Sequence, residues 1–291
     1  MSEVRIAVKC ICCESFNLLR SPAILMPFLT KRIFGYEPIM ITPEWGLRDI
    51  QQGMAYQICN SLQCQDCGVL FSDIRFSNEE MSRLYSGYRD KDYSDTRERF
   101  EPGYMRVAES YCIPGSYVEK VESFLKPYLP VDFTILDWGG DTGINTPLRL
   151  DAQSTDIYDI SEKEVIDGVR KVSLAEALTK QYDLIVCSQV LEHVSYPLNI
   201  LEQISPLMHQ KTFLYVEVPF EGLMRECGLR FDAYKLKHHW HEHINFFTAD
   251  AILKMLLKFK LDVIEIKEIP ISLQWRDSYI ISVLCKRIQS A

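Results

Sequence analysis

Ten cysteines are the most chemically distinctive residues of this 291-residue chain, and six of them lie within its first 67 positions. Two pairs show C-x-x-C spacing, Cys10 with Cys13 and Cys64 with Cys67. Two thiolates at this spacing can bind one tetrahedral zinc ion at about 2.3 Å, and two such pairs complete a closed four-sulfur site. A closed site leaves no position for substrate, so the spacing predicts one structural Zn²⁺. The other six cysteines are interpreted as ordinary thiols.

A second group of residues surrounds a glycine-bearing turn. The segment Asp137-Trp138-Gly139-Gly140-Asp141-Thr142-Gly143 follows an apolar run, and Asp159 lies 22 residues after Asp137, at the end of the next apolar run. Glycines let a backbone approach a ligand closely, and a carboxylate at the end of a second strand can bind both hydroxyls of a ribose. The turn is neither G-x-G-x-x-G nor a lysine-bearing P-loop, so the pattern favours a nucleoside without phosphates. S-adenosylmethionine fits this description.

Histidines form the third group, in the run His238-His239-Trp240-His241-Glu242-His243. Because histidine titrates near neutral pH, it suits the removal of a proton from a substrate. We interpret the run as the source of a general base. A metal site within it is the less favoured alternative, since adjacent histidines on a loop rarely converge on one ion. His193, which follows a separate apolar run, is the second candidate base.

The elements that position these groups alternate between strands and helices. Apolar runs predict strands at 133–137, 154–160, 182–187, 213–218, 262–269 and 279–285. Helical patterns lie between them, for example at 197–208 and 249–259. This alternation predicts an α/β fold with a doubly wound, mostly parallel, seven-stranded sheet. Ligands of such sheets bind beyond the carboxyl ends of the strands, which places Asp137, Asp159 and Ser188 on one rim.

The N-terminal region has a different pattern. Ser77 and Glu80 form a capping box, and the helix that follows carries Tyr85 and Tyr88. By default these tyrosines are packing residues, and a place at the mouth of a substrate site is the alternative. Residues 89–103 are charged and aperiodic, and they are interpreted as a loop.

A boundary between two regions is expected near residue 100. Beyond it, Ser116 and Glu119 form a capping box that opens another helix, and a short helix is expected after Ser173. We therefore expect a zinc-binding and helical module at 1–100 and the alternating domain at 101–291.

The alternating domain resembles a class I S-adenosylmethionine-dependent methyltransferase over residues 104–291. The turn that begins at Asp137 is similar to the first motif of that family, Asp159 matches its ribose-binding acid, and Tyr182–Val194 is close to its fourth-strand motif. Asp141 stands where many members have a glycine. The resemblance implies a Rossmann-like fold and methyl transfer. The cofactor-binding residues that it implies are Asp137, Trp138, Gly139, Gly140, Gly143, Asp159, Ser188 and Gln189.

The order of the motifs along the chain narrows this resemblance to one group of methyltransferases. Two C-x-x-C knuckles, a tyrosine-bearing helix and this core resemble methyltransferases that modify sugars in deoxysugar and surface-polysaccharide pathways. In the sugar C-methyltransferases of that group, a Glu-His pair lies in a segment similar to Glu242–Phe247, and a tyrosine of the N-terminal domain reaches the substrate. The resemblance implies His243 as the base and Tyr85 or Tyr88 as the tyrosine. The predicted catalytic residues are His243, Glu242, Tyr88 and His193.

The composition argues against several other classes of protein. Apolar residues make up 47% of the chain and charged residues 25%, as in ordinary soluble globular proteins. The longest apolar run, Ala23–Leu29, is much shorter than the ~20 residues of a membrane helix, so we expect a cytoplasmic protein. A net charge of −8 disfavours nucleic acid and favours a small-molecule acceptor such as a sugar. An RNA methyltransferase and a non-catalytic zinc-stapled scaffold are the alternatives.

Overall fold

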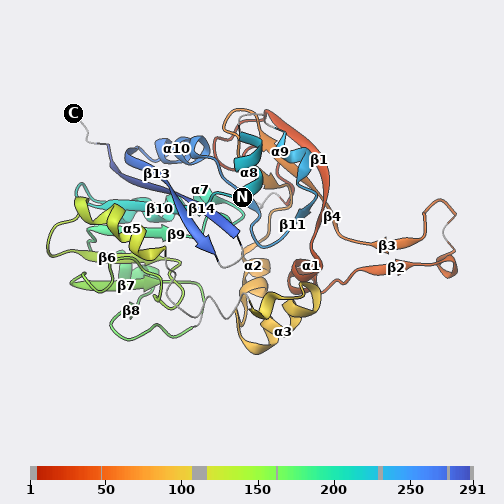
Figure 1. Cartoon of the computed structure of the whole chain (residues 1–291), viewed down its shortest axis with the longest axis horizontal. Coiled ribbons are helices and arrows are strands. Elements are labelled where there is room, and N and C mark those ends of the chain that lie inside the picture. Colours follow the sequence, from red (N-terminus) through yellow and green to blue (C-terminus); the bar gives the residue numbers. More distant parts are fainter. Residues whose placement is uncertain are drawn as a thin grey trace.

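The computed structural model describes residues 5–46, 48–106, 117–161, 163–228, 232–273 and 276–288, except for the side chains at 272, 273, 276 and 277. The larger sheet has seven strands in the order β13-β14-β10-β9-β6-β7-β8 (Figure 1). They are β6 (Thr134–Trp138), β7 (Ser154–Tyr158), β8 (Arg170–Lys171), β9 (Leu184–Ser188), β10 (Phe213–Pro219), β13 (Leu261–Leu273) and β14 (Arg276–Arg287). Strands β6 to β10 run parallel, and β14 is antiparallel to both of its neighbours. The predicted seven-stranded, mostly parallel sheet is confirmed.

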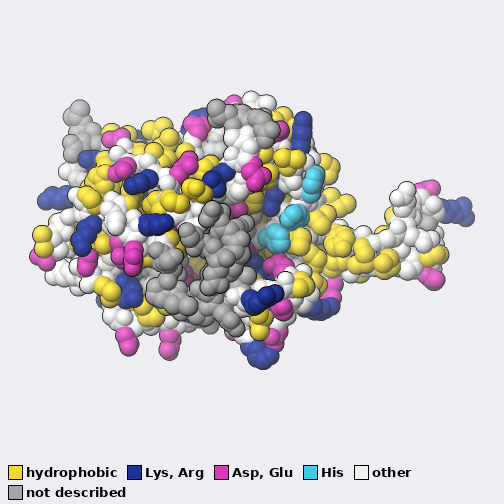
Figure 2. Space-filling model, in the orientation of Figure 1, with side chains coloured by type: hydrophobic (Ala, Val, Ile, Leu, Met, Phe, Trp, Pro, Cys, Tyr) yellow, Lys and Arg dark blue, Asp and Glu magenta, His cyan; other side chains and the backbone are white. Residues whose placement is uncertain are grey.

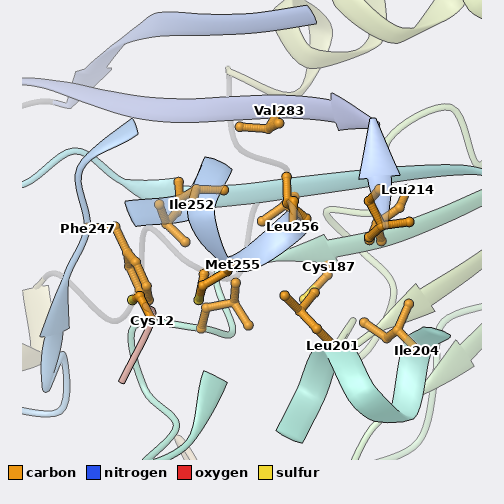
Figure 3. Packing of buried hydrophobic residues seen from close by; sticks show 14 of the residues in the cluster. Cys12, Cys187, Leu201, Ile204, Leu214, Phe247, Ile252, Met255, Leu256 and Val283 are labelled. Atoms are coloured by element: carbon orange, nitrogen blue, oxygen red, sulfur yellow. The ribbon is translucent and has the colours of Figure 1, made fainter. Parts of the chain in front are cut away.

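Helices cover both faces of this sheet, because successive side chains of each strand point to opposite faces. Leu136 packs in the same cluster as residues of α7 (Pro197–Ile204) and α10 (Ala249–Lys258), some of which are seen in Figure 3. The preceding residue, Ile135, packs on the other face with α5 (Val118–Leu125). The sheet is therefore doubly wound, and the carboxyl ends of β6, β7 and β9 meet at one rim.

Several predicted helix starts can be checked at their caps. Ser77 forms the predicted capping box of α2 (Asn78–Tyr85), and Ser173 forms that of α6 (Leu174–Ala177). The capping box predicted at Ser116 lies outside the described residues. The other short helices are α1 (Pro27–Phe34), α8 (Gly222–Cys227), α9 (Ala233–Leu236) and the 3-10 turns η1 (Pro43–Trp45), η2 (Lys126–Tyr128) and η3 (Ser205–Leu207).

A second, five-stranded sheet has the order β11-β1-β4-β5-β12. Its strands are β1 (Leu18–Leu25), β4 (Ile58–Cys64), β5 (Leu70–Ser72), β11 (His239–Trp240) and β12 (Asn245–Phe246). The centre is the antiparallel pair β1 and β4, while β11 and β12 come from the histidine-rich run and the residues just after it. The histidine-rich run is therefore attached to the N-terminal sheet. The domain division near residue 100 stays a prediction.

Helix α3 (Lys91–Phe100) corrects the loop predicted at 89–103. Asp90 caps this helix, since its carboxylate accepts a hydrogen bond from the amide of Tyr93 at 2.7 Å. The ring of Tyr93 is fully buried against Phe28 of α1, with 5.1 Å between ring centroids. Few other side chains of the helix are buried, so it lacks the apolar periodicity that would reveal it.

A two-stranded ribbon, β2 (Ile39–Ile41) and β3 (Gly53–Ala55), projects away from the rest of the molecule (Figure 1). Figure 2 shows apolar side chains along it, and a strip of histidines near its base. Within the described part of the chain, no helix is both long and apolar enough to cross a membrane.

Candidate active site and metal centre

The four cysteines predicted to bind zinc converge. The Sγ atoms of Cys10 and Cys67 are 3.5 Å apart, as are those of Cys13 and Cys64, and all four Sγ atoms lie within 4.8 Å of one another. Four sulfurs that bind one zinc ion tetrahedrally at about 2.3 Å lie about 3.8 Å from one another. The donor set and its compactness therefore fit a structural zinc ion.

Hydrogen bonds attach this cluster to helix α10, which packs on the larger sheet. The amide of Gly68, in the left-handed region at φ 79°, donates to the carbonyl of Cys64 at 2.9 Å and closes the second knuckle. The hydroxyl of Thr248 donates to the carbonyl of Cys67 at 2.6 Å. Because Thr248 is also the N-cap of α10, the knuckle and this helix are fixed to each other.

The glycine turn after β6 packs tightly against the segment after β9. Gly139 has φ 83°, and a Cβ at this position would lie 2.5 Å from Cγ2 of Val190. Asp141, the departure from the family pattern, has φ 52° and so adopts the left-handed conformation that a glycine would supply. Aspartate tolerates this region better than most residues, and Lys163 Nζ lies 3.1 Å from its carboxylate. The turn therefore keeps its conformation with aspartate at this position.

Asp159, the predicted ribose-binding acid, lies directly after β7 and beside this turn. One carboxylate oxygen accepts a hydrogen bond from the amide of Asp141 at 2.9 Å, and the other accepts one from the amide of Ser161 at 2.6 Å. The half-buried carboxylate thus joins the end of β7 to the glycine turn.

The two residues at the end of β6 have different surroundings. Asp137 is buried and accepts a hydrogen bond from the hydroxyl of Thr146 at 2.5 Å. Burial raises the pKa of Asp137 to about 7, and the nearby acids Asp159 and Glu217 add to the rise. The side chain of Trp138 is buried in the core, with its ring 4.4 Å from that of Tyr158. Because this side chain packs in the core, only the backbone of Trp138 is left to contact the cofactor. That contact stays a prediction.

Ser188 and Gln189 meet a buried carboxylate that the sequence reading missed. The Ser188 hydroxyl donates to Glu217 Oε1 at 2.7 Å, and the Gln189 amide donates to the same atom at 2.9 Å. The hydroxyl of Tyr215 donates to the other oxygen at 2.6 Å. Burial raises the pKa of Glu217. A lone acid within the apolar strand β10 was the sequence signal for this position.

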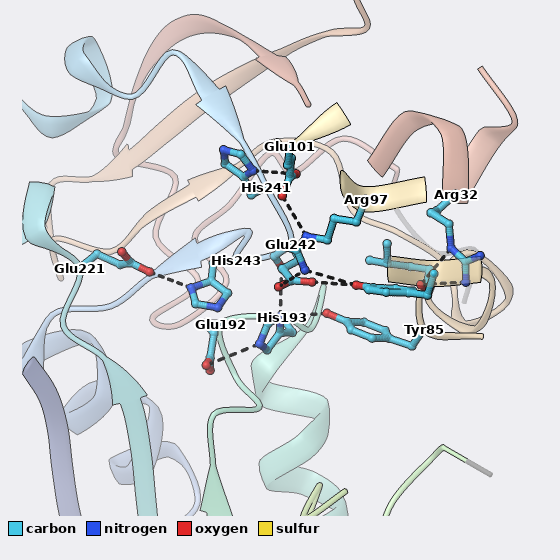
Figure 4. Close-up of polar contacts among 12 residues, drawn as sticks. Arg32, Tyr85, Arg97, Glu101, Glu192, His193, Glu221, His241, Glu242 and His243 are labelled. Carbon is cyan, nitrogen blue, oxygen red and sulfur yellow. Dashed lines mark hydrogen bonds and ion pairs between the residues drawn. The ribbon is translucent and has the colours of Figure 1, made fainter. Parts of the chain in front are cut away.

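The two candidate bases lie side by side (Figure 4). The ring centroids of His193 and His243 are 4.6 Å apart. His193 Nδ1 lies 2.8 Å from the hydroxyl of Tyr85 and 3.3 Å from the carbonyl of Glu242. His243 Nδ1 lies 2.8 Å from Glu221 Oε1. Glu221 follows β10 and was also missed by the sequence reading.

The two imidazoles have opposite pKa shifts. Burial lowers the pKa of His193 to about 3, and the neighbouring His243 lowers it further. For His243, burial also acts to lower the pKa, but the hydrogen bond and charge of Glu221 outweigh it and raise the value to about 9. The two rings therefore differ in charge at neutral pH.

Glu242 faces the N-terminal helices. Its carboxylate lies 2.9 Å from Arg97 Nη1 and 3.2 Å from the hydroxyl of Tyr93, both on α3. Burial acts to raise the pKa of Glu242, but the Arg97 guanidinium outweighs it and holds that pKa at about 2. Arg97 lies in the segment predicted as a loop, which is why it was not expected here.

Tyr88 connects this cluster to the glycine turn. Its ring contacts those of Tyr85 and Tyr93, with centroid distances of 5.4 and 5.3 Å. Lys163 Nζ lies 4.9 Å from the ring centroid of Tyr88 while it also pairs with Asp141. The structure thus brings all four predicted catalytic residues into one cluster, beside the predicted cofactor rim.

A family model described as a methyltransferase domain matches residues 105–266. The chain belongs to this methyltransferase family. It is an S-adenosylmethionine-dependent methyltransferase, as its motifs implied.

Three solved structures are similar to this methyltransferase at low identity. A magnesium protoporphyrin IX methyltransferase from Synechocystis PCC 6803 is 15% identical over 72% of this chain and 97% of its own, with a TM-score of 0.47. A 1,6-didemethyltoxoflavin-N1-methyltransferase from Burkholderia thailandensis is 13% identical over 66% and 87%, with a TM-score of 0.47. A SAM-dependent methyltransferase from Methanosarcina mazei is 14% identical over 57% and 98%, with a TM-score of 0.42. No curated protein matches the sequence.

The rim of the methyltransferase sheet fits its cofactor. Asp159 lies where a ribose-binding acid is expected, and Gly139 keeps the turn free of a side chain that would strike Val190. The buried carboxyls of Asp137 and Glu217 would offer acidic groups to a cofactor that carries a sulfonium cation. These residues, with Ser188 and Gln189 at the end of β9, would hold the cofactor.

Asn245 fixes the histidine segment of the methyltransferase to the turn after β9. Its side-chain amide donates to the carbonyls of Leu191 and Val194 at 2.8 and 2.7 Å. Its Oδ1 accepts a hydrogen bond from the buried guanidinium of Arg75 at 2.9 Å. Two segments that are far apart in sequence, each carrying a candidate base, are thereby held next to each other.

The other histidines of the run do not join this cluster. His241 Nδ1 lies 3.1 Å from Glu101, and the rings of His239 and His241 contact each other at 5.3 Å. Among the described residues, the metal-capable group that includes a histidine of this run is Glu192, His193 and His243. One histidine of the run, His243, thus belongs to a metal-capable group, and its partners come from the turn after β9.

Proposed function

We propose that this methyltransferase modifies a small molecule, a sugar or nucleotide-linked sugar of glycan or secondary-metabolite biosynthesis. The observation that carries this proposal is the position of a cluster of histidines, carboxylates and tyrosines beside the glycine turn. Lys163 joins the two, since it contacts both Asp141 and the ring of Tyr88. An acceptor in this cluster would lie next to the cofactor rim.

The cluster offers the groups that a polyhydroxylated acceptor needs. Imidazoles and carboxylates bind hydroxyl groups, and aromatic rings such as Tyr85 and Tyr88 pack against the apolar face of a sugar ring. The cysteine knuckles and the Glu242–Phe247 segment support a sugar through the resemblance described above. The net charge of −8 favours this reading over the RNA alternative, because RNA binding requires a basic surface.

The chain's own residues supply positioning and proton removal. When bound, S-adenosylmethionine supplies an electrophilic methyl group. Glu221 holds His243 through Nδ1. In the neutral form of the ring, which dominates above its pKa of about 9, Nε2 is left to accept a proton from the acceptor. His193 is held by Tyr85 and is the second candidate. Arg97 holds Glu242 beside both histidines.

The test is a transfer assay with labelled cofactor and a panel of nucleotide-linked and free sugars, with structured RNA as a parallel substrate. We expect one sugar to be methylated. His243→Asn should lower kcat by about 10²–10⁴-fold while calorimetry shows unchanged cofactor affinity. His209→Asn, in the loop before β10, is the matched control. Methylation of RNA alone, or full kcat in the His243 variant, would contradict the proposal.

A further inference from the structure

Glu192 is a buried carboxylate that lacks an ordinary partner. It is 1% exposed, and neither of its carboxylate oxygens has a hydrogen-bond partner in the described part of the chain. Its contact with His193 Nε2, at 3.7 Å from Oε1, is longer than a hydrogen bond. A buried carboxylate costs several kcal/mol unless it is paired or coordinates a metal ion. The side chain therefore points to a ligand.

Two imidazoles converge on this carboxylate. Glu192, His193 and His243 each offer a ligand atom, and these atoms all lie within 4.8 Å of one another. Figure 4 shows the three side chains directed toward one another from the turn after β9 and from the segment before β12. Two imidazoles and one carboxylate form a donor set for divalent transition metals.

The Nδ1 atom of each imidazole already has a hydrogen-bond partner. His243 Nδ1 lies 2.8 Å from Glu221, and His193 Nδ1 lies within 3.3 Å of the carbonyl of Glu242. Histidines that bind a metal through one nitrogen almost always donate the other N–H to a carboxylate, carbonyl or water, which fixes the tautomer and the ring orientation. This arrangement leaves Nε2 of both rings for a metal.

The backbone holds the two segments together. The amides of Ile244 and Asn245 donate to the carbonyl of Glu192 at 2.9 and 3.1 Å. These backbone hydrogen bonds hold the segments that carry the three side chains and leave the metal-binding atoms unused. Such support is what a preorganised metal site requires.

We propose that Glu192, His193 and His243 bind one divalent transition-metal cation of the zinc, cobalt and nickel class. Its nitrogen and oxygen donors distinguish this site from the four-cysteine site, whose donors are all sulfur. A cation bound here occupies the imidazole nitrogens that would remove the acceptor's proton, so it inhibits methyl transfer. The inhibition rests on the proposed function, whereas the binding of the cation does not.

The binding test uses purified protein whose cysteine site is loaded with zinc, titrated with CoCl₂ alone. Calorimetry should show one further cobalt per chain, and the visible spectrum should show cobalt without thiolate-to-cobalt charge transfer. Glu192→Gln should weaken cobalt binding by about 100-fold or more, and Glu221→Gln, which acts through His243, by about 10–100-fold. Glu202→Gln, an exposed acid on α7, should bind cobalt as the unchanged chain does. Thermal unfolding checks that each variant is folded.

Failure of cobalt to bind beyond the cysteine site, or equal affinity in the Glu192 and Glu202 variants, would overturn the site. The inhibition is measured separately, as the cobalt concentration that halves transfer to the sugar found above. That concentration should rise in Glu192→Gln in proportion to the weaker binding. If cobalt binds through Glu192 and transfer is unaffected, the site stands and the role of the histidines in the proposed function is overturned.

Discussion

Arg97 and Glu242 form a buried ion pair, with 2.9 Å between Nη1 and Oε1, across 145 residues of sequence. The two side chains are only 12% and 13% exposed. Arg97 also lies over the ring of Tyr104, at 4.2 Å from the centroid, and pairs with Glu101. Helix α3 is therefore attached to the histidine segment by charge as well as by packing.

Arg97→Gln should destabilise the protein by about 3–5 kcal/mol, because it leaves Glu242 as a buried charge without its cation. Chemical denaturation measures the loss. Arg99→Gln is the matched control on the same helix, since the Arg99–Glu37 pair lies at the surface, where solvent screens its charges and it contributes little to stability. Equal losses of unfolding free energy in the two variants would show that the buried Arg97–Glu242 pair contributes no more than the Arg99–Glu37 pair.

The larger sheet could be predicted because its information is local. Apolar runs mark β6, β9 and β10, and helical periodicity marks α7 and α10. The cysteine spacing marked the four-sulfur cluster for the same reason. At Asp141 the sequence showed a departure from the family turn, but only the backbone showed that this aspartate takes the left-handed conformation of a glycine.

The candidate site was only half predictable, because it depends on contacts between distant segments. His193 was found as a histidine after an apolar run, and His243 through the histidine-rich run and the family resemblance. The spacing of the residues does not pair them with each other or with Tyr85. Helix α3 is polar outside its single buried stripe, so its Arg97 was not expected near Glu242. Glu192 and Glu217 could have been noticed in the sequence, since each is an acid beside apolar residues and such an acid is a candidate for a buried site.

The four-cysteine cluster of the purified protein should hold about one zinc per chain. Cys64→Ala should remove the zinc and lower the unfolding temperature, because metal binding contributes to folding free energy. Cys59→Ala is the control, since this buried cysteine lies on the same strand, β4, outside the cluster. Elemental analysis measures the zinc content of the two variants. Zinc lost in both variants or in neither would contradict the assignment of zinc to the four-cysteine cluster.

Asp159→Asn should weaken the binding of S-adenosylmethionine by about 10–100-fold, because hydrogen bonds to a charged group contribute about 1.5–3 kcal/mol. The substitution also weakens the contacts that join β7 to the glycine turn. Asp151→Asn, an exposed acid paired with Lys126, should bind the cofactor normally. Isothermal calorimetry gives both affinities, and unchanged binding in Asp159→Asn would remove Asp159 from the cofactor site.

Asn245→Ala should cost about 3–5 kcal/mol of stability and should slow methyl transfer. It removes three side-chain hydrogen bonds in a buried region: one from the guanidinium of Arg75 and one to each of the carbonyls of Leu191 and Val194. The turn that carries His193 then loses its support. Asn199→Ala, exposed on α7, should change stability by less than about 0.5 kcal/mol. Denaturation curves for the two variants test this, and similar midpoints would contradict it.

Asp137 should make the protein less stable as pH rises. Burial raises its pKa from 3.8 to about 7 in the folded state, so between these values the folded state binds more protons than the unfolded state. Stability from this group is therefore present below pH 4 and lost progressively up to pH 7, by as much as about 4 kcal/mol.

Asp137→Asn removes this titration, while its amide oxygen can still accept the hydrogen bond from Thr146. Relative to the unchanged chain, the variant should thus gain unfolding free energy between pH 5 and pH 8. Asp151→Asn, an exposed acid, should show no such gain. Because Glu217 is present in both proteins, the comparison isolates Asp137. If the difference in unfolding free energy between variant and parent is the same at pH 5 and at pH 8, the Asp137 carboxyl is ionised throughout and the prediction is wrong.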